Sequence, residues 1–432
     1  MTKQKKEEDY DFATLAVHGG YFDVEEHSRS RVPPLYQTTS FTFKDDKHAA
    51  RLFALEEPGN IYTRIMNPTT AIFEQRIAQL EGGIGALAVA SGQSAETITF
   101  MTLAGQGDEI VSSSEIYGGS YTLLNYTLRK LGISTTFLPL DDPAVFAEHI
   151  TEKTKMLYLE TLPNPKLTMP DLEEFAKIAH ENDLPLVVDN TVPSPYLLNP
   201  IKWGADIVVH STTKYISGHG YTIGGMIVDS GNFAWEDSPR FPDFREPEEA
   251  YHGLKFSETF GSFAFLAKAR TLLLRDLGAA LSPFNAWLGL IGVETLPLRM
   301  EKISKNAQQV AEFLANHDKV AWVNYPGLKQ GEDGALYQKY MPKGYSGLLG
   351  FGLKGGYDAA VKVINSVQLF SHLANIGDVR SLIIHPASTT HQQLSPEEQE
   401  AAGISQEFIR LSLGIEDPND LIEDLKQAFD QL

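Results

Sequence analysis

Seven short apolar runs, separated by segments of helical pattern, limit the fold of this chain more than any other feature of its sequence. Runs of this length indicate buried strands, and their alternation with helices predicts a mainly parallel sheet covered on both faces. The runs are Ala86–Ala90, Glu109–Ser113, Thr135–Leu140, Lys155–Thr161, Pro185–Asn190, Asp206–Thr212 and Gly224–Asp229. We therefore expect an α/β domain built on a seven-stranded sheet.

The remainder of the chain divides on either side of this region. Residues Met1–Met66 are polar and irregular, with Pro33-Pro34 interrupting any long element, so they predict an N-terminal arm. A helix is expected over Thr69–Leu80, where apolar residues repeat at helical spacing. From about Lys268, long helices and further strand-like segments near Trp322, Leu348 and Ser381 predict a smaller C-terminal α/β domain. The predicted units are an arm (1–66), a large domain (67–267) and a C-terminal domain (268–432).

The composition argues against several classes of protein. The chain has no cysteine, which excludes disulfides, thiolate metal sites and a cysteine nucleophile. Its net charge of -20 argues against a nucleic-acid surface, and no basic run extends beyond Lys3–Lys6. The start of the chain lacks the apolar core of a signal peptide, and no apolar run approaches the length of a bilayer span. We expect a cytoplasmic protein with no metal site and with neither nucleic acid nor membrane as a partner.

The residues suited to chemistry lie where the predicted strands end. Parallel sheets bind ligands at the carboxyl ends of their strands, and Glu160, Thr161, Asp189 and the segment Ser211–Lys214 lie there. Lys214 follows a strand that looks buried, and burial lowers the pKa of an amine, as a lysine that forms a Schiff base requires. A surface lysine after a strand is the alternative interpretation of Lys214 by itself.

Two further features give Lys214 partners. Asp189 ends an apolar strand, where an unpaired carboxylate is costly and a protonated pyridine nitrogen would pair with it. A turn acid just past a strand is the alternative for Asp189. At Ser91–Ser94 a strand passes into a helix whose first amides can bind a phosphate dianion. The hydroxyls of Ser211 and Thr213 can bind phosphate oxygens close to the lysine, so these residues form one coherent site.

Taken together, these motifs resemble the Cys/Met-metabolism family of pyridoxal 5'-phosphate enzymes of fold type I, from about His18 to the C-terminus. The resemblance implies a pyridoxal 5'-phosphate site in which Lys214 holds the aldehyde carbon and Asp189 holds the ring nitrogen. Backbone amides of Gly92 and Gln93 would bind the phosphate. The full set of implied cofactor-binding residues is Tyr62, Arg64, Gly92, Gln93, Tyr117, Asn164, Asp189, Ser211, Thr213 and Lys214.

The same resemblance assigns further roles. Tyr117 matches the tyrosine that stacks on the cofactor ring and helps to move protons, so it joins Lys214 as a catalytic residue; a core tyrosine is the alternative. Asn164 resembles the asparagine beside the 3'-oxygen of the cofactor. Arg410 matches the arginine whose two-pronged guanidinium binds the substrate carboxylate, and Ser381 lies in the segment that lines the same pocket.

The segment around Tyr62 and Arg64 carries an implication about assembly. Tyr62-Thr-Arg64, with Asn67-Pro-Thr, resembles the family segment that reaches from a neighbouring subunit to the cofactor phosphate. The resemblance therefore implies a homo-oligomer, usually a tetramer of paired dimers, with active sites shared between subunits.

Within the family, several stretches resemble the O-acetylhomoserine sulfhydrylase branch, among them Ser91-Gly-Gln, Phe260–Phe265 and Leu274–Gly278. That branch implies a transferase of methionine biosynthesis that replaces the acetate of O-acetyl-L-homoserine by sulfide or methanethiol. Cystathionine γ-synthase, the γ-lyases and a non-catalytic relative of the fold are the alternatives. Methionine γ-lyases tend to carry a cysteine shortly after the position of Tyr117, where this chain has Gly118-Gly119, so the lyase alternative is disfavoured. The sequence assigns no role to Arg380.

Overall fold

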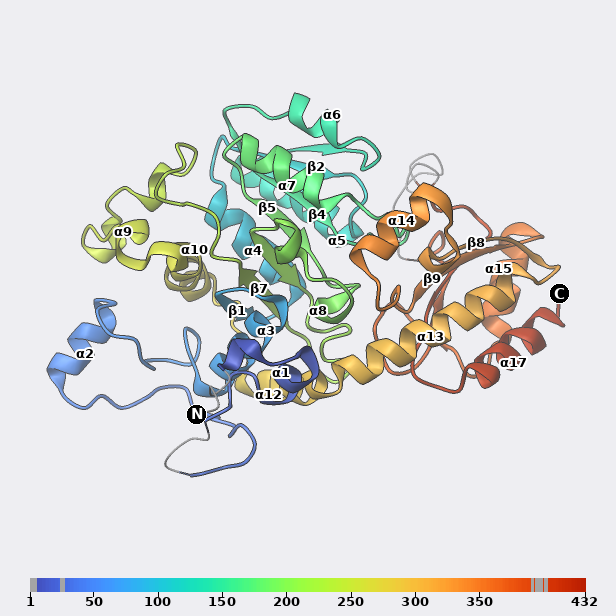
Figure 1. The fold of residues 1–432 in the computed structure, drawn as a ribbon, viewed down its shortest axis with the longest axis horizontal. Coiled ribbons are helices and arrows are strands. Elements are labelled where there is room, and N and C mark those ends of the chain that lie inside the picture. Colours follow the sequence, from blue (N-terminus) through green and yellow to red (C-terminus); the bar gives the residue numbers. More distant parts are fainter. Residues whose placement is uncertain (1–5, 24–27, 390–391, 393–398, 400–402) are drawn as a thin grey trace.

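The architecture consists of two sheets joined by one long helix (Figure 1). The computed structural model describes residues 6–23, 28–389, 392, 399 and 403–432, so most of the Lys3–Lys6 stretch lies outside it. Within these residues, every helix is too short or too polar to cross a bilayer.

The first sheet has seven strands in the spatial order β1-β7-β6-β5-β4-β2-β3. Strand β7 runs antiparallel to both of its neighbours, β6 and β1, while the other pairs are parallel. The strands are β1 (Gly85–Val89), β2 (Glu109–Ser113), β3 (Ser134–Leu138), β4 (Thr154–Glu160), β5 (Leu186–Asp189), β6 (Ile207–His210) and β7 (Gly225–Asp229). The expected mainly parallel, seven-stranded sheet is confirmed.

Both faces of this sheet are buried because its strands are apolar at consecutive positions. On β4, Leu157 and Leu159 belong to one apolar cluster while Met156 and Tyr158 belong to the cluster on the other face. Helix α3 (Pro68–Glu81) covers the first face, and helix α4 (Gly92–Leu103) packs in the second cluster. Two large apolar clusters are therefore separated by one sheet, as expected for a doubly covered parallel sheet.

Helix α3 shows how the local sequence sets its ends. Asn67 caps it by accepting a hydrogen bond from the Thr69 amide at 3.0 Å, and Pro68 occupies its first turn, where a proline needs no amide hydrogen. It ends at Gly82, whose φ of 77° lies in the left-handed region. The helix expected over Thr69–Leu80 is thus confirmed within one residue at each end.

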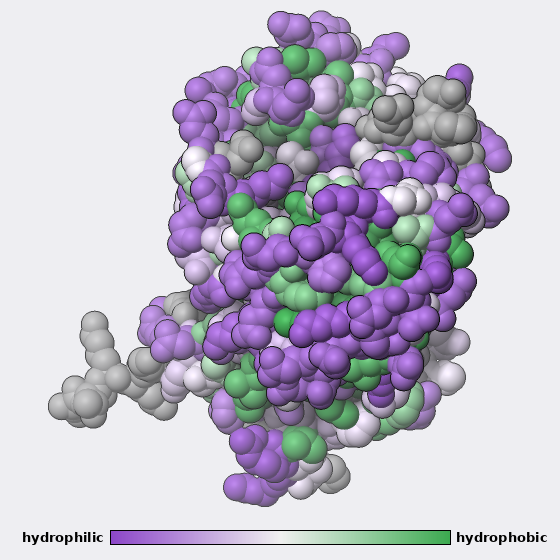
Figure 2. All heavy atoms as spheres, turned by 90° about the vertical axis from the view of Figure 1, so that its right-hand side faces the viewer, coloured by the Kyte–Doolittle hydropathy of each residue, from purple (hydrophilic) through white to green (hydrophobic). Residues whose placement is uncertain are grey.

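Helix α13 (Leu296–Ala315) runs from the first sheet to the second, which has the order β10-β11-β12-β9-β8 (Figure 1). Its strands are β8 (Val320–Asn324), β9 (Leu348–Leu353), β10 (Ser371–His372), β11 (Leu382–Ile384) and β12 (Phe408–Ser412). Helices α15 (Gly356–Ser366) and α17 (Pro418–Phe429) pack their apolar sides into the same cluster as β9 and β12. The outward side of this region is mostly hydrophilic (Figure 2).

The boundary near Lys268 stays a prediction, because helices on both sides of it contact the first sheet or its helices. Helix α12 (Pro283–Glu294) packs on α3. The other helices are α5 (Gly118–Thr122), α6 (Pro143–Glu148), α7 (Leu172–Glu181), α8 (Ser194–Leu197), α9 (Phe256–Phe260), α10 (Ala264–Lys268), α11 (Arg275–Leu277) and α14 (Gly331–Tyr340).

The N-terminal segment is less extended than its polar sequence suggests. Helix α1 (Phe12–His18) buries Leu15 and Ala16 against α3 and α12. Farther along, helix α2 (Asp46–Phe53) projects from the body of the molecule (Figure 1). The segment therefore combines a docked helix with a protruding part.

Candidate active site

Lys214 lies in the turn that follows β6, at the carboxyl edge of the first sheet. Its Nζ donates a hydrogen bond to Oδ1 of Asn375 at 2.5 Å. Burial, with a smaller effect from the positive charge of Arg410, lowers the pKa of the Lys214 amine to about 8. Far more of this amine is therefore neutral near neutral pH than of an ordinary lysine, and the neutral form can act as a nucleophile or accept a proton.

Arg410 lies on β12 of the second sheet and contacts Asn375, as Lys214 does. Its Nη2 donates to the backbone oxygen of Asn375 at 3.1 Å, and its Nη1 donates to Oδ1 of Asn164 at 3.3 Å. The side chain is buried, and Nε has no hydrogen-bond partner among the described residues. Burial lowers the pKa of its guanidinium to about 10. A buried arginine that contacts no carboxylate of the described chain is suited to bind one from a ligand.

Asp189 ends β5 and lies in register with Glu160, the last residue of β4, on the same face of the sheet. Oδ1 of Asp189 accepts a hydrogen bond from the Thr191 amide at 2.7 Å. Removal from water raises the pKa of both carboxyls, and the charge of Asp189 raises the pKa of Glu160 further. Asp189 remains partly exposed while Glu160 is buried, so Asp189 is the acid that a ligand can reach.

A third acid, Glu96 of helix α4, contacts strand β4 through Tyr158. It accepts hydrogen bonds from Ser120 Oγ at 2.6 Å, Tyr158 OH at 2.9 Å and Gln93 Nε2 at 2.8 Å. Burial and then the charge of Asp189 raise its pKa to about 8. Among the described residues, none of the three acids forms an ion pair with a lysine or an arginine. Asp189 is the one of these acids that a ligand can reach, and a positive charge beside it would favour its ionised form.

The start of helix α4 lies next to the Lys214 turn. Ser91 caps the helix by accepting from the Ser94 amide at 3.1 Å. A Cβ atom on Gly92 would lie 2.7 Å from Cβ of Ser211, so only glycine permits this approach of the helix start to the turn. Thr213 Oγ1 is engaged with the backbone of Gly224, at 3.2 and 3.1 Å. The first turn of a helix beside serine and threonine hydroxyls is suited to a phosphate.

Tyr117 and Asn164 meet at the buried carboxyl of Glu160. The Tyr117 amide donates to Glu160 Oε1 at 2.5 Å, and the Asn164 amide also lowers the pKa of this carboxyl. The side chain of Tyr117 is 53% exposed, so its ring is free to cover a ligand above the sheet edge.

Three of the predicted residues are not joined to this group in the described chain. Tyr62 and Arg64 contact each other, with 5.5 Å between the guanidinium carbon and the ring centre, and Arg64 Nη1 donates to the backbone oxygen of Arg275 at 2.8 Å. Ser381 is buried, and its hydroxyl donates to Glu416 at 2.9 Å. The roles predicted for these three residues stay predictions, as do the roles of the other site residues.

Several polar residues in or near this region were given no role by the sequence. Asn375 had no signal, since it is one polar residue in a loop, although it contacts both Lys214 and Arg410. Glu96 did have a signal in the sequence, because it is the single charged residue of Gly92–Leu103. His210, in the strand before Lys214, is fully buried, and its Nε2 lies 2.6 Å from Oε1 of Glu81. Arg380 lies exposed, with contacts to Asp378 and Tyr221.

The residues of this edge fit pyridoxal 5'-phosphate on three separate grounds. The acid cluster lacks a cation that a pyridinium nitrogen at Asp189 would supply. The Gly92 helix start can receive a phosphate, and the Lys214 amine has the lowered pKa that bond formation with an aldehyde requires. The donor set and its charges thus agree with the cofactor.

Comparison with known proteins gives a consistent answer over almost the whole chain. Residues 13–430 match the family described as Cys/Met metabolism PLP-dependent enzyme, where PLP is pyridoxal 5'-phosphate. The chain is 55% identical to the O-acetyl-L-homoserine sulfhydrylase of Leptospira meyeri, with 96% of each protein covered. It is 50% identical to O-acetyl-L-homoserine sulfhydrylase 1 of Thermus thermophilus, with 97% of this chain and 99% of that protein covered. The homocysteine synthase of Schizosaccharomyces pombe is also 50% identical, with 97% and 98% covered.

A solved structure supports the same fold. It is a crystal structure from Campylobacter jejuni, assigned as an O-acetylhomoserine (thiol)-lyase, in which one lysine carries pyridoxyl 5'-monophosphate. The two structures superpose with a TM-score of 0.94 at 42% identity, over 98% of this chain and all of the other.

Proposed function

Because the chain belongs to the Cys/Met-metabolism family of pyridoxal 5'-phosphate enzymes, we propose that it replaces the acetate of O-acetyl-L-homoserine by sulfide or methanethiol. The products of this γ-replacement are homocysteine or methionine, together with acetate. Relatives at 50 to 55% identity carry the names O-acetyl-L-homoserine sulfhydrylase and homocysteine synthase, and this supports the choice of substrate.

The observation that carries the proposal is the placement of Lys214 and Arg410 around one residue, Asn375. The side-chain oxygen of Asn375 accepts from Lys214, and its backbone oxygen accepts from Arg410. An amino acid whose carboxylate pairs with Arg410 would therefore present its α-carbon close to the Lys214 amine. This geometry suits proton transfer at the α-carbon of an amino-acid substrate.

Bound pyridoxal 5'-phosphate supplies an electron sink for the electron pair left when the α-carbon loses its proton. Asp189 would hold the ring nitrogen in its protonated form, since a cation there relieves the cost of the partly desolvated carboxylate. The Lys214 amine, with its pKa of about 8, takes the α-proton in its neutral form. Lys214 or Tyr117 then takes a β-proton, and acetate leaves from the γ-carbon. Sulfide or a thiol adds at the same carbon, and protons return to the β- and α-carbons.

The remaining residues of the site bind and orient. We assign the phosphate to the amides of Gly92 and Gln93 and to the hydroxyls of Ser211 and Thr213, supported by the position of the α4 start beside the Lys214 turn. We assign Asn164 to the 3'-oxygen of the cofactor and Ser381 to the substrate pocket. Asn164 already contacts Arg410, which supports a place near the substrate carboxylate.

We also propose that the active sites are shared in a homo-oligomer, most simply a tetramer of paired dimers. Tyr62 is 42% exposed, and it lies with Arg64 on the segment that follows the protruding α2. Together they help to line a cavity of about 300 Å³ that contains none of the residues around Lys214. Side chains placed in this way are available to complete the phosphate site of a second copy.

A direct assay tests the reaction. Purified enzyme should consume O-acetyl-L-homoserine with sulfide or methanethiol, and borohydride should fix the cofactor to Lys214 in a peptide identified by mass spectrometry. Preference for O-succinylhomoserine with cysteine, or cleavage of cystathionine or methionine, would instead assign the chain to a synthase or lyase branch. Light scattering at several concentrations measures the oligomeric state.

A further inference from the structure

Glu160 is a buried acid that the proposed reaction leaves without a task. It ends β4 directly beside Asp189, and only 5% of its surface is exposed. Its Oε1 accepts the backbone amide hydrogen of Tyr117 at 2.5 Å, although Tyr117 lies on a different loop and its side chain is largely exposed. A contact from a buried strand end to an exposed loop can restrain that loop.

The side chain of Glu115 gives the Tyr117 loop two further contacts. Glu115 accepts a hydrogen bond from Thr168 Oγ1 at 2.6 Å and lies 3.6 Å from Lys166 Nζ. These contacts join the loop to the segment that follows β4, but they do so through a side chain two residues before Tyr117. The Glu160 contact acts on the backbone of Tyr117 itself.

The second amide directed at Glu160 belongs to Asn164, which lies on the loop after β4. The side chain of Asn164 in turn accepts from Arg410. One carboxyl thus lies between the loop that carries the ring-stacking tyrosine and the loop that contacts the carboxylate-binding arginine. A change at this carboxyl is expected to act first on the Tyr117 loop, to which it is hydrogen-bonded.

We propose that Glu160 is a positioning residue. It holds the Tyr117 and Asn164 loops in the positions from which they contact the cofactor and the substrate. The inference rests on the roles proposed above for Tyr117 and Asn164. It assigns Glu160 no contact with reacting atoms, since its effect passes through the Tyr117 backbone. Its burial next to Asp189 raises the pKa of its carboxyl, so Gln, which is neutral and has the same shape, should retain most of the function.

Hydrogen–deuterium exchange of the wild-type holoenzyme gives the first test. The Tyr117 amide should be strongly protected although the tyrosine side chain is exposed, because its hydrogen is held by a buried acceptor. Rapid exchange at Tyr117 would overturn the proposal without the need for any variant.

Three variants give the second test. Glu160→Met keeps the length of the side chain but removes the acceptor, and it should increase Tyr117 exchange and the dissociation constant for pyridoxal 5'-phosphate, each by about tenfold. Glu160→Gln should restore both values to near wild type. Glu115→Met, the same substitution two residues before Tyr117, should leave the Tyr117 amide protected. Equal effects of Glu160→Met and Glu115→Met would contradict a specific role for Glu160.

A double-mutant cycle then asks whether Glu160 acts through Tyr117. Glu160→Met should lower kcat by about 10²-fold, as expected when a group near the reacting atoms is misplaced. Combined with Tyr117→Phe, its effect should be much smaller, because the tyrosine function has already been lost. Multiplicative effects would refute action through Tyr117. Exchange and cofactor affinity need no substrate, so they remain valid tests even if O-acetylhomoserine is not the donor.

Discussion

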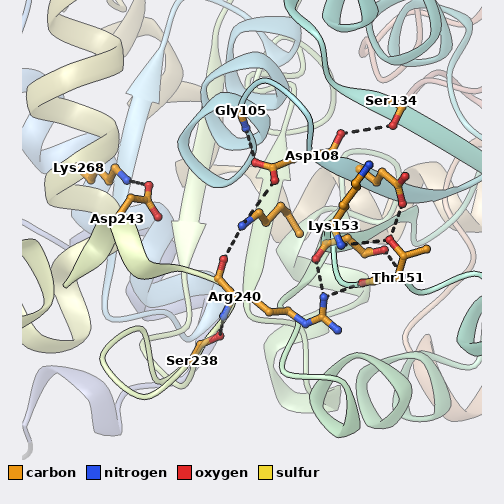
Figure 3. A network of polar contacts seen from close by, with 12 residues as sticks. Gly105, Asp108, Ser134, Thr151, Lys153, Ser238, Arg240, Asp243 and Lys268 are labelled. Atoms are coloured by element: carbon orange, nitrogen blue, oxygen red, sulfur yellow. Dashed lines mark hydrogen bonds and ion pairs between the residues drawn. The ribbon is translucent and has the colours of Figure 1, made fainter. Parts of the chain in front are cut away.

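Charged side chains at the two ends of the seven-stranded sheet differ in the partners that they contact. At the amino ends of β2 and β4, Lys155 donates to the backbone oxygen of Arg240 and lies 3.7 Å from Asp108 (Figure 3). The guanidinium of Arg240 donates to backbone oxygens of Thr151 and Thr154. Lys155, Asp108 and Arg240 thus have partners within the described chain, whereas the buried Asp229 at the same end has one carboxyl oxygen without a partner. At the carboxyl ends, Asp189 and Arg410 converge on the Lys214 turn and form no ion pair within the described chain.

A perturbed pKa by itself does not separate the two ends. Asp206 and Asp229 lie at the amino end, and burial raises the pKa of both, to about 7 for Asp229. Asp206 is satisfied there by His180 at 2.9 Å and by the Leu186 amide at 2.8 Å. What distinguishes the candidate site is a set of desolvated groups that complement a ligand. The convergence of several desolvated groups around Asn375, more than any single shifted pKa or unpaired atom, therefore identifies the functional end.

The lysines of the two ends provide the largest contrast. Lys214→Ala should lower kcat by about 10⁴-fold, because it removes both the covalent anchor and a general base. Lys268 is also buried, but its amine pairs with Asp243 and lies 4.3 Å from the Phe244 ring centre (Figure 3). Lys268→Ala should lower the melting temperature and leave kcat per folded enzyme unchanged. Steady-state kinetics and calorimetry of both variants check this; loss of kcat in Lys268→Ala would contradict the contrast between the two ends.

Asp189 at the carboxyl end and Asp206 at the amino end should differ in the same way, the first affecting turnover and the second stability. Asp189→Asn should lower kcat by about 10²–10³-fold, because the cofactor nitrogen loses the charge that keeps it protonated. Asp206→Asn keeps one oxygen acceptor but removes the negative charge opposite His180, so it should reduce stability and spare turnover. The measurements are kcat, the visible absorbance of the bound cofactor and the urea unfolding midpoint. If Asp189→Asn behaves like Asp206→Asn, the proposed role of Asp189 is wrong.

The arginines are expected to show a smaller difference. Arg410→Lys should raise KM for O-acetyl-L-homoserine by about 10–100-fold, since a lysine cannot reproduce two charge-assisted hydrogen bonds to a carboxylate. Arg240→Lys should alter stability alone, because the partners of Arg240 are backbone oxygens of its own chain. An unchanged KM in Arg410→Lys would remove the carboxylate role.

Much of the fold follows from sequence because local signals and burial agree. The apolar runs that predicted seven strands match the observed strands within one or two residues at most ends, and both apolar clusters use alternate residues of those runs. The polar segment before Met66 was less informative. Only two buried side chains, Leu15 and Ala16, dock α1 against the body, and such a short apolar pattern gives little signal.

The site was predictable where one residue type has a specific chemical use. Lys214 and Asp189 follow strands, and Arg410 lies in a recognisable stretch, so these three could be proposed before any geometry was known. Asn375 and Glu160 could not be given roles, because their importance comes from contacts across long sequence separations. The Lys214–Asn375 hydrogen bond spans 161 residues and the Tyr117–Glu160 bond spans 43. Spacing along a chain does not reveal which loop a side chain meets.

Asp229 should make the stability of the amino end depend on pH. The pKa of Asp229 rises from its ordinary value of 3.8 to about 7, chiefly because the carboxyl is buried, and Oδ2 has no partner among the described residues. A raised folded-state pKa adds stability that is complete below pH ~4 and is lost as the pH rises through ~7. Because a tenfold change in proton affinity corresponds to about 1.4 kcal/mol, this contribution is at most about 4 kcal/mol.

The wild-type urea midpoint should therefore fall between pH 5 and pH 8 more steeply than that of Asp229→Asn, whose amide does not ionise. Turnover at a fixed pH should be the same in both proteins, because Asp229 lies at the end of the sheet away from Lys214. Parallel pH profiles of the two midpoints would show that Asp229 ionises normally. Burial of Asp229 would then carry no electrostatic cost. A raised carboxyl pKa would in that case be a sign of the functional end.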